Sequence, residues 1–278
     1  MIIDAHAHLC QQPRGLEQVV ASGRLEQVWL MDVSGCALQT NPFASEAEVL
    51  QAAKDFPGFF VPFGYLDLRQ GPDIVDRLKD KGFVGLKAYR PAQPYDHPGY
   101  FAHYGRAAAL KMPILFHTGL LEKCPVGKMG PDLSYGPNNM RPSHLATIAA
   151  AFPALTLIGG HLGYPWLEET AQSLYYYPNI HHDLSGYRKD VEWLIKNLDR
   201  KCSDGAPGPR RYFNDKILFA SDALCYGDGK GHADAFKLMD FWELFLEMVG
   251  GNYYRWGEPE ERAKIMGGNA RELMEAMR

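Results

Sequence analysis

The sequence predicts an α/β fold, a single (β/α)8 barrel, because eight short apolar runs alternate along the chain with segments of helical pattern. The runs are continuously apolar rather than alternating, as expected for parallel strands that are covered on both faces. A doubly wound open sheet is the alternative arrangement of the same elements. The eight runs span residues 2–8, 28–33, 59–67, 82–89, 113–119, 155–163, 179–186 and 216–224.

The segments between the runs carry helix signals. Ser45 and Glu48 have the spacing of a capping box at the start of residues 45–56, and Ser143 can cap a helix over residues 143–152. We find no internal repeat and no linker, so we expect one domain over residues 1–278. Two Gly/Pro-rich stretches, 120–142 and 203–210, are expected to be long loops. The first follows the fifth strand, where a barrel would place an active-site loop.

Composition narrows the classes of partner. The net charge of −4 and the pI near 6.2 give no basic surface for nucleic acid or an anionic membrane, so we expect a small-molecule substrate and leave a homo-oligomer open. No apolar segment approaches the ~18 residues needed to cross a bilayer, and we expect a cytoplasmic protein. The five cysteines are scattered and are expected to be free thiols: Cys10, Cys36, Cys124, Cys202 and Cys225.

Polar residues occur where the apolar runs end. His6 and His8 stand one residue apart in the first strand, so both imidazoles face the same side. In a barrel all the carboxyl ends of the strands meet in one mouth, which would bring together residues distant in sequence. Imidazole and carboxylate groups are ligands for a divalent ion such as Zn²⁺. The other polar strand ends carry Lys87, His117, His161, His181, His182, Asp183 and Asp222.

A family resemblance adds to this picture. D-A-H-A-H at 4–8, F-H-T-G at 116–119, G-H-L-G-Y-P-W at 160–166, A-S-D at 220–222 and K-I-M-G-G-N-A-R-E-L at 264–273 resemble the amidohydrolase superfamily, in particular its amidohydrolase-2 branch. That branch of TIM-barrel enzymes includes lactonases, hydratases, and carboxymuconate-semialdehyde and resorcylate decarboxylases. The resemblance implies that His6, His8, His117 and Asp222 bind the metal, with His161 beside it as an acid/base or a further ligand.

Lys87 lies on the strand where binuclear relatives carry a lysine carbamate between two metals. We expect it to stay unmodified and to pair with a carboxylate of the mouth or with an anionic substrate, which leaves one ion, with two only if Lys87 is carbamylated. His181 and His182 are expected to be mostly structural, because adjacent strand residues face opposite ways.

We therefore expect a metal-dependent hydrolase that uses one divalent ion, zinc, to activate water. Asp222 would accept the proton of the water, and His161 would polarise the carbonyl or share the proton transfer. We expect the substrate to be a small carboxylated or sugar-derived lactone, with its carboxylate bound by Arg90 and Arg141 and its pocket lined by Tyr164.

Two alternatives remain open. The same ligands suit a metal-dependent decarboxylase of an unsaturated or aromatic carboxylate, because a Lewis acid also stabilises the charge left when CO₂ departs. A non-catalytic metal-binding barrel is less favoured, because structural zinc sites usually include cysteine and this set has none.

Overall fold

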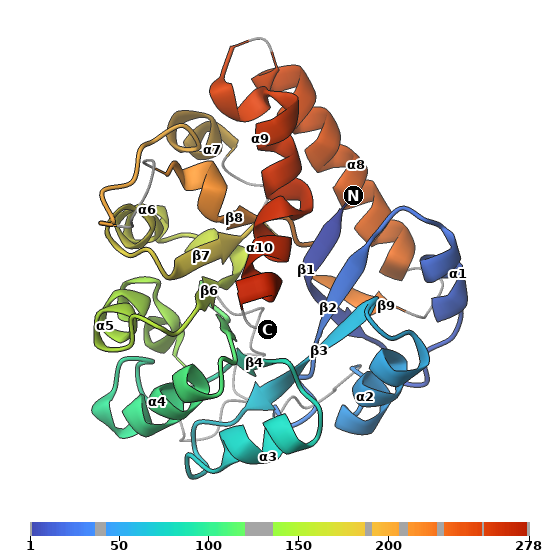
Figure 1. The fold of residues 1–278 in the computed structure, drawn as a ribbon, viewed down its shortest axis with the longest axis vertical. Helices are drawn as coiled ribbons and strands as arrows, with labels where there is room; N and C mark the ends of the chain where they lie inside the picture. The colour runs from blue at the N-terminus through green and yellow to red at the C-terminus, as the bar shows by residue number, and fades with distance from the viewer. Residues whose placement is uncertain are drawn as a thin grey trace.

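The computed structural model describes residues 2–36, 43–119, 136–186, 191–205, 211–226, 231–251 and 253–276, without the side chains of residues 224, 225, 231 and 232. Parallel strands form a nearly closed ring, and helices surround it (Figure 1). The predicted TIM barrel is therefore confirmed, and the open-sheet alternative is wrong. Its strands are β1 (Ile3–Leu9), β2 (Gln27–Met31), β3 (Phe60–Leu66), β4 (Gly85–Ala88), β5 (Ile114–Phe116), β6 (Leu157–Gly159), β7 (Ile180–Asp183), β8 (Ile217–Leu218) and β9 (Ala223–Tyr226).

The eighth apolar run forms two strands rather than one. β8 pairs with β7, and β9 pairs with β1. The run breaks between them because Asp222 has a φ of 50° and the amide of Ser221 donates to the Asp4 carboxylate at 2.9 Å. Backbone bonds across this break help to close the ring, from Ala5 N to Phe219 O at 3.0 Å and from Asp222 N to His6 O at 2.9 Å.

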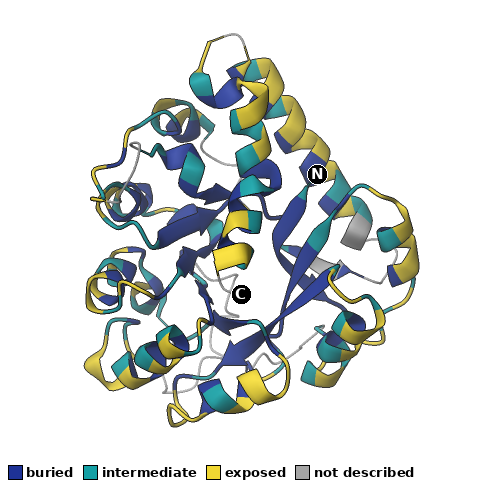
Figure 2. Cartoon of the chain, in the orientation of Figure 1, coloured by how far each residue is buried: buried dark blue, intermediate teal, exposed yellow. Residues whose placement is uncertain are grey.

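Helices cover the outside of the ring, with buried faces toward the strands and exposed faces toward solvent (Figure 2). This arrangement explains the continuously apolar strands, since one face meets the helices and the other fills the barrel. The helices are α1 (Leu16–Ala21), α2 (Glu46–Asp55), α3 (Ile74–Asp80), α4 (Phe101–Ala109), α5 (Ser143–Ala151), α6 (Leu167–Tyr176), α7 (Val191–Asn197), α8 (Gly231–Phe245), α9 (Pro259–Ala263) and α10 (Asn269–Ala276).

Helix α10 closes the amino-terminal end of the barrel. Ala270 and Leu273 pack into the apolar cluster that fills the barrel interior, next to residues such as Ile3 at the start of β1. In Figure 1 this helix lies across the centre of the ring. The opposite end, where the strands terminate, is therefore the end that is available for a site.

One of the two expected helix caps is present. Ser45 and Glu48 form the capping box of α2. The prediction for Ser143 is wrong: this residue is the first residue of α5, and Pro142 occupies the cap position. The amide of Ser143 donates instead to the carboxylate of Glu169 at 3.2 Å, so a side chain from α6 satisfies the helix terminus.

The described cysteine side chains, Cys10, Cys36 and Cys202, are buried free thiols, as predicted. Cys124, the side chain of Cys225, residues 120–135 of the first expected loop and residues 206–210 of the second lie outside the described part. Within the described ranges, none of the helices has the length and apolar character needed to cross a membrane.

Candidate metal centre

The first strand delivers two histidines to the mouth of the barrel. The pairing of β1 with β2 shifts in register between Asp4 and Ala7. Ile3 and Ala5 therefore fill the barrel interior, whereas His6 and His8 reach the mouth with ring centroids 5.4 Å apart. A register shift of this kind changes the face to which later side chains point.

Three of the four expected ligands converge. Nε2 of His8 lies 3.5 Å, and Nε2 of His6 lies 3.8 Å, from Oδ1 of Asp222. One possible ligand atom from each of these residues lies within 4.8 Å of the other two. Nitrogen and carboxylate oxygen donors at this separation fit a divalent ion of the Zn²⁺ or Mn²⁺ type.

The second nitrogen of each imidazole is already engaged. Nδ1 of His8 lies 3.1 Å from the backbone oxygen of Met31, and Nδ1 of His6 lies 2.9 Å from Oδ2 of Asp183. Histidines that bind metals commonly donate their other N–H to a carbonyl or a carboxylate in this way. The orientation of both rings thus supports the fit.

His117 lies beside the triad rather than within it. Its Nδ1 is 3.1 Å from Nε2 of His161, and its Nε2 is a buried polar atom with no hydrogen-bond partner in the described residues. A buried, unsatisfied imidazole nitrogen is costly in a chain without a bound ion. This orphaned atom is consistent with the predicted role of His117 as a fourth ligand, which stays a prediction.

His161 occupies a sharp turn directly after β6. Its φ is 58° and that of Leu162 is 49°, a left-handed conformation that is unfavourable for residues with side chains. Nδ1 of His161 lies 2.9 Å from Ser185 O and 4.0 Å from Oδ2 of Asp222. The ring is therefore placed next to the triad, as expected for an acid/base.

Asp183 is a site residue to which the sequence analysis gave no role. His6, His161 and Asp183 form a second group of potential ligands within 4.8 Å of one another. However, the carboxylate already accepts hydrogen bonds from His6 and from the amide of His161, so we regard this group as a hydrogen-bond cluster. The signal in the sequence was a carboxylate at the end of an otherwise buried strand.

Burial keeps the imidazoles of His6 and His117 neutral, and the neighbours of Asp222 keep its carboxylate ionised. Burial, followed by the charge of Lys87, lowers the pKa of His6 to about 4. Burial also holds the pKa of His117 well below its ordinary value. Burial alone would raise the pKa of Asp222, but its hydrogen bond with His8 and the nearby imidazoles hold it below its ordinary value. Neutral imidazoles and a carboxylate are the forms that bind metals.

Lys87 is almost fully buried, with 1% of its surface exposed, and its Nζ lies 2.9 Å from Nε2 of His6. Burial lowers its pKa to about 8, while Asp183 and Asp222 raise it. The amine is therefore mainly an ammonium at neutral pH, and its two carboxylate neighbours suit the predicted unmodified state.

The three residues predicted to contact the substrate already have partners within the chain. Arg141 pairs with Glu169 and packs over the ring of Trp166 at 5.1 Å. The guanidinium of Arg90, a residue with a φ of 51°, lies 5.2 Å from the ring of Tyr89. Tyr164 is partly buried and packs against the larger of the hydrophobic clusters. Arg141 thus joins the segment before α5 to α6, and its role as a substrate anchor stays a prediction.

The two histidines of β7 face apart. Nε2 of His182 lies 3.2 Å from the hydroxyl of Ser173 in α6, so this ring points outward. His181 pairs in register with Ile158, which belongs to the cluster inside the barrel. The contact of His182 is structural, whereas the ring of His181 has no hydrogen-bond partner at Nδ1 among the described residues, and its structural role stays a prediction.

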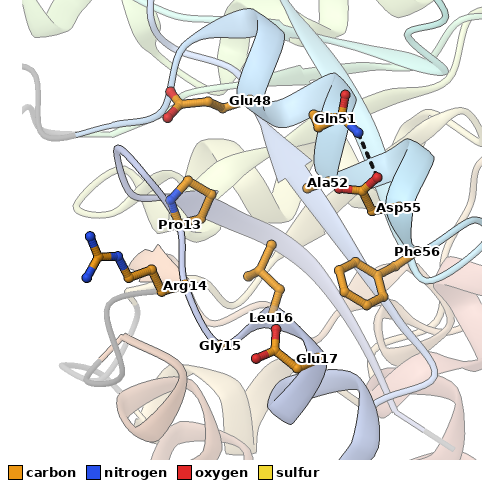
Figure 3. Close-up of a pocket in the computed structure, with 10 residues that line it drawn as sticks. All are labelled: Pro13, Arg14, Gly15, Leu16, Glu17, Glu48, Gln51, Ala52, Asp55 and Phe56. Atoms are coloured by element: carbon orange, nitrogen blue, oxygen red, sulfur yellow. Dashed lines mark hydrogen bonds between the residues drawn. The ribbon is translucent and has the colours of Figure 1, made fainter.

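A surface pocket lies apart from the histidines, between the loop after β1 and helix α2 (Figure 3). Among its lining residues, Glu48 caps α2 and Asp55 accepts a hydrogen bond from Gln51 at 2.6 Å. These contacts serve the helix, and we assign the pocket no role in the chemistry.

Comparison with solved structures identifies the same fold at low identity. An uncharacterized TIM-barrel protein of Bordetella bronchiseptica has a TM-score of 0.67 and 17% identity, with 99% of each chain covered. A probable 2-pyrone-4,6-dicarboxylic acid hydrolase of Acinetobacter baumannii with citric acid bound has a TM-score of 0.60 and 13% identity, with 99% of each chain covered. A 5-carboxyvanillate decarboxylase of Novosphingobium aromaticivorans complexed with manganese has a TM-score of 0.61 and 13% identity, with 99% of this chain and 96% of that chain covered.

A sequence search finds no matching curated protein. The model of the family described as Amidohydrolase matches residues 3–275. This family consists of metal-dependent enzymes, and the cluster of histidines and aspartates in the mouth fits a metal site. Because the match spans nearly the whole barrel, the chain belongs to the amidohydrolase family.

Proposed function

We propose that the chain is a metal-dependent hydrolase that opens a small carboxylated or sugar-derived lactone. The observation that carries this proposal is the convergence of Nε2 of His6, Nε2 of His8 and Oδ1 of Asp222 at the open end of the barrel. We propose that these atoms, together with His117, hold one divalent ion, which we expect to be Zn²⁺. Such an ion acts as a Lewis acid on a carbonyl and lowers the pKa of water from ~15.7 toward ~7.

The residues around this centre can move the protons of a hydrolysis. Asp222 is ionised and can accept a proton from attacking water through its carboxylate. His161 lies 4.0 Å from Oδ2 of Asp222 and can share the transfer to the alkoxide that leaves when the lactone opens. Lys87 adds a positive charge beside His6, which suits an anionic substrate.

The similarity to a probable hydrolase of 2-pyrone-4,6-dicarboxylic acid supports this substrate class, because a 2-pyrone is a cyclic ester and this one carries two carboxylates. Decarboxylation is the second candidate. It is favoured by the comparable TM-score, 0.61, of a manganese-bound decarboxylase. That neighbour also makes manganese the alternative to zinc.

One set of measurements tests both the metal dependence and the class of reaction. Metal content is measured on protein purified without chelator, and activity is measured on a lactone panel by proton release and on a panel of unsaturated and aromatic carboxylates by CO₂ evolution. We expect turnover on the lactone panel that is lost on chelation. Turnover confined to the carboxylate panel would refute the hydrolase proposal, and full activity without metal would refute the metal centre.

Arg141 provides a finer test of the substrate. If it anchors a carboxylate, Arg141→Met lowers kcat/KM for carboxylated lactones but not for neutral ones. Glu169→Gln is the matched control, since it removes the ion-pair partner of Arg141 and leaves the guanidinium in place. Equal losses on both classes of lactone in Arg141→Met would show that the residue only joins the segment before α5 to α6.

A further inference from the structure

The turn at the end of β7, Asp183–Leu184–Ser185, contacts two histidines of the mouth, His6 and His161. The proposed reaction gives this turn no role. The carboxylate of Asp183 is fully buried. Its Oδ2 lies 2.9 Å from Nδ1 of His6. Its Oδ1 accepts the amide of His161 at 2.8 Å and both the amide and the hydroxyl of Ser185, at 3.0 and 2.5 Å. One carboxylate thus joins strand β1 to the sharp turn after β6.

These contacts decide which nitrogen of His6 carries the proton. An ionised carboxylate only accepts hydrogen bonds, so Nδ1 of His6 must donate to Asp183. On the other side of the ring, the ammonium of Lys87 only donates, and it lies 2.9 Å from Nε2. Both neighbours therefore select the same tautomer, in which Nε2 of His6 keeps its lone pair.

The same turn reaches His117 through His161. The backbone oxygen of Ser185 lies 2.9 Å from Nδ1 of His161, and a carbonyl only accepts, so this nitrogen carries the proton. In the tautomer with its proton on Nδ1, His161 accepts at Nε2 from Nδ1 of His117 at 3.1 Å. The lone pair of His117 is left on Nε2, the buried atom that has no partner in the described residues.

We propose that the Asp183–Leu184–Ser185 turn is a positioning element that sets the tautomers of His6 and His117, so that both present Nε2 to the metal. The inference rests on the proposed metal centre. Asp183 acts through the imidazoles and is a positioning residue. Gly160 lies beside this arrangement: a Cβ there would lie 3.2 Å from the backbone oxygen of Phe116 and at ordinary contact distances, 3.6 and 3.8 Å, from Cε1 of His6 and Oδ2 of Asp183.

Asp183→Asn tests the proposal because an amide has only one accepting oxygen. If that oxygen faces His161 and Ser185, the NH₂ group faces Nδ1 of His6 and forces the proton onto Nε2. If the oxygen faces His6, the NH₂ group opposes the amide of His161. Either orientation of the amide disturbs the site, whereas the size of the side chain is unchanged.

Affinity for Zn²⁺ is measured by competition with a chelator for the wild type, Asp183→Asn and Asp32→Asn. Asp32 is the matched control because it is a buried carboxylate in an Asp-x-Ser turn at the end of β2. We expect Asp183→Asn to bind Zn²⁺ about 10- to 100-fold more weakly, and Asp32→Asn to stay within about twofold of the wild type. Unchanged affinity in Asp183→Asn, or an equal loss in Asp32→Asn, would overturn the proposal.

A second measurement uses the wild-type protein, so it does not depend on whether a variant folds. Imidazole ¹⁵N chemical shifts of the metal-free wild type at pH 7 report which nitrogen is protonated. We expect His6 and His117 to be neutral with the proton on Nδ1, and the opposite tautomer of either would overturn the inference. If the wild type binds no divalent ion, the proposed function fails, while these tautomers still decide whether the turn acts as proposed.

Discussion

Two turns of this barrel have the same local structure and different surroundings. Asp32–Val33–Ser34 follows β2, and Asp183–Leu184–Ser185 begins at the last residue of β7. In each turn one carboxylate oxygen accepts both the amide and the hydroxyl of the serine, at 2.8 and 2.6 Å in the first turn and at 3.0 and 2.5 Å in the second. Both aspartates are buried, with 2% and 0% of their surface exposed.

The two carboxyl groups nevertheless shift in opposite directions. Burial raises the pKa of Asp32, and the hydrogen bonds of Ser34 offset this only in part. Burial acts in the same direction on Asp183, but the electrostatic interaction and the hydrogen bond with His6, together with His161, hold its pKa below the ordinary value. The comparison shows that the Asp-x-Ser turn is a general way to end a strand, and that the facing histidines make the second turn part of the site.

Of the variants that distinguish the two turns, His6→Ala should show the largest loss of metal affinity and stability. His6→Ala deletes one proposed ligand and leaves the buried carboxylate of Asp183 without its imidazole partner. We expect a loss of Zn²⁺ affinity beyond the 10- to 100-fold that removal of an outer partner causes, with loss of activity. Stability should fall by about 3–5 kcal/mol, as for other broken buried pairs. Metal analysis and urea denaturation measure the two effects.

His103→Ala is the control for this variant. His103 is also buried, in α4, its Nε2 lies 2.9 Å from the backbone oxygen of Gln70, and it belongs to neither group of potential ligands found among the described residues. It should lose stability without losing bound metal. Equal metal content in His6→Ala and the wild type would contradict the assignment of His6.

Much of this site follows from simple rules of strand geometry. The runs of apolar residues predicted the barrel, and polar residues at their ends predicted a shared mouth. The spacing of His6 and His8 predicted that they face one side, and their rings do lie 5.4 Å apart at the mouth, although the pairing of β1 with β2 shifts in register between Asp4 and Ala7. The resemblance to amidohydrolases then selected the ligands.

The partners of these residues depend on packing that no local pattern encodes. Asp183 and Asp32 have the same spacing to a serine, yet only Asp183 faces the imidazole of His6, because only the short strand β8 separates β7 from β1 around the ring. Arg141 was a candidate for substrate binding, but Glu169, which lies on α6, pairs with it. The break in the eighth strand depends on Asp4, which lies far away in the sequence.

The pH dependence of stability tests the Asp32–Val33–Ser34 turn, in which the pKa of the aspartate shifts in the opposite direction to that of Asp183. The folded chain raises the pKa of Asp32 above 3.8, so just above that pH the folded state binds more protons than the unfolded state. The contribution of Asp32 to stability is therefore present at low pH and is lost as the pH rises through its raised pKa. Asp32→Asn lacks this contribution.

Urea denaturation of metal-free wild type and Asp32→Asn between about pH 4 and pH 7 checks this expectation. The stability of the wild type relative to Asp32→Asn should decrease as the pH rises. A difference that stays constant or increases over this range would contradict the raised pKa of Asp32.

The serines of the two turns should give the smallest effects and the finest distinction. Ser34→Ala and Ser185→Ala each remove a hydroxyl that donates to a buried carboxylate, and each should lower stability by about 1–3 kcal/mol. Only the hydroxyl of Ser185 also lies near imidazoles, 3.0 Å from Nδ1 of His6 and 2.9 Å from Nδ1 of His161. Ser185→Ala should therefore weaken Zn²⁺ binding, but by less than about tenfold, because Asp183 and the Ser185 carbonyl still hold both rings. Ser34→Ala should leave Zn²⁺ affinity unchanged, and a similar loss in both variants would mean that stability of the barrel, rather than orientation of the histidines, determines metal binding.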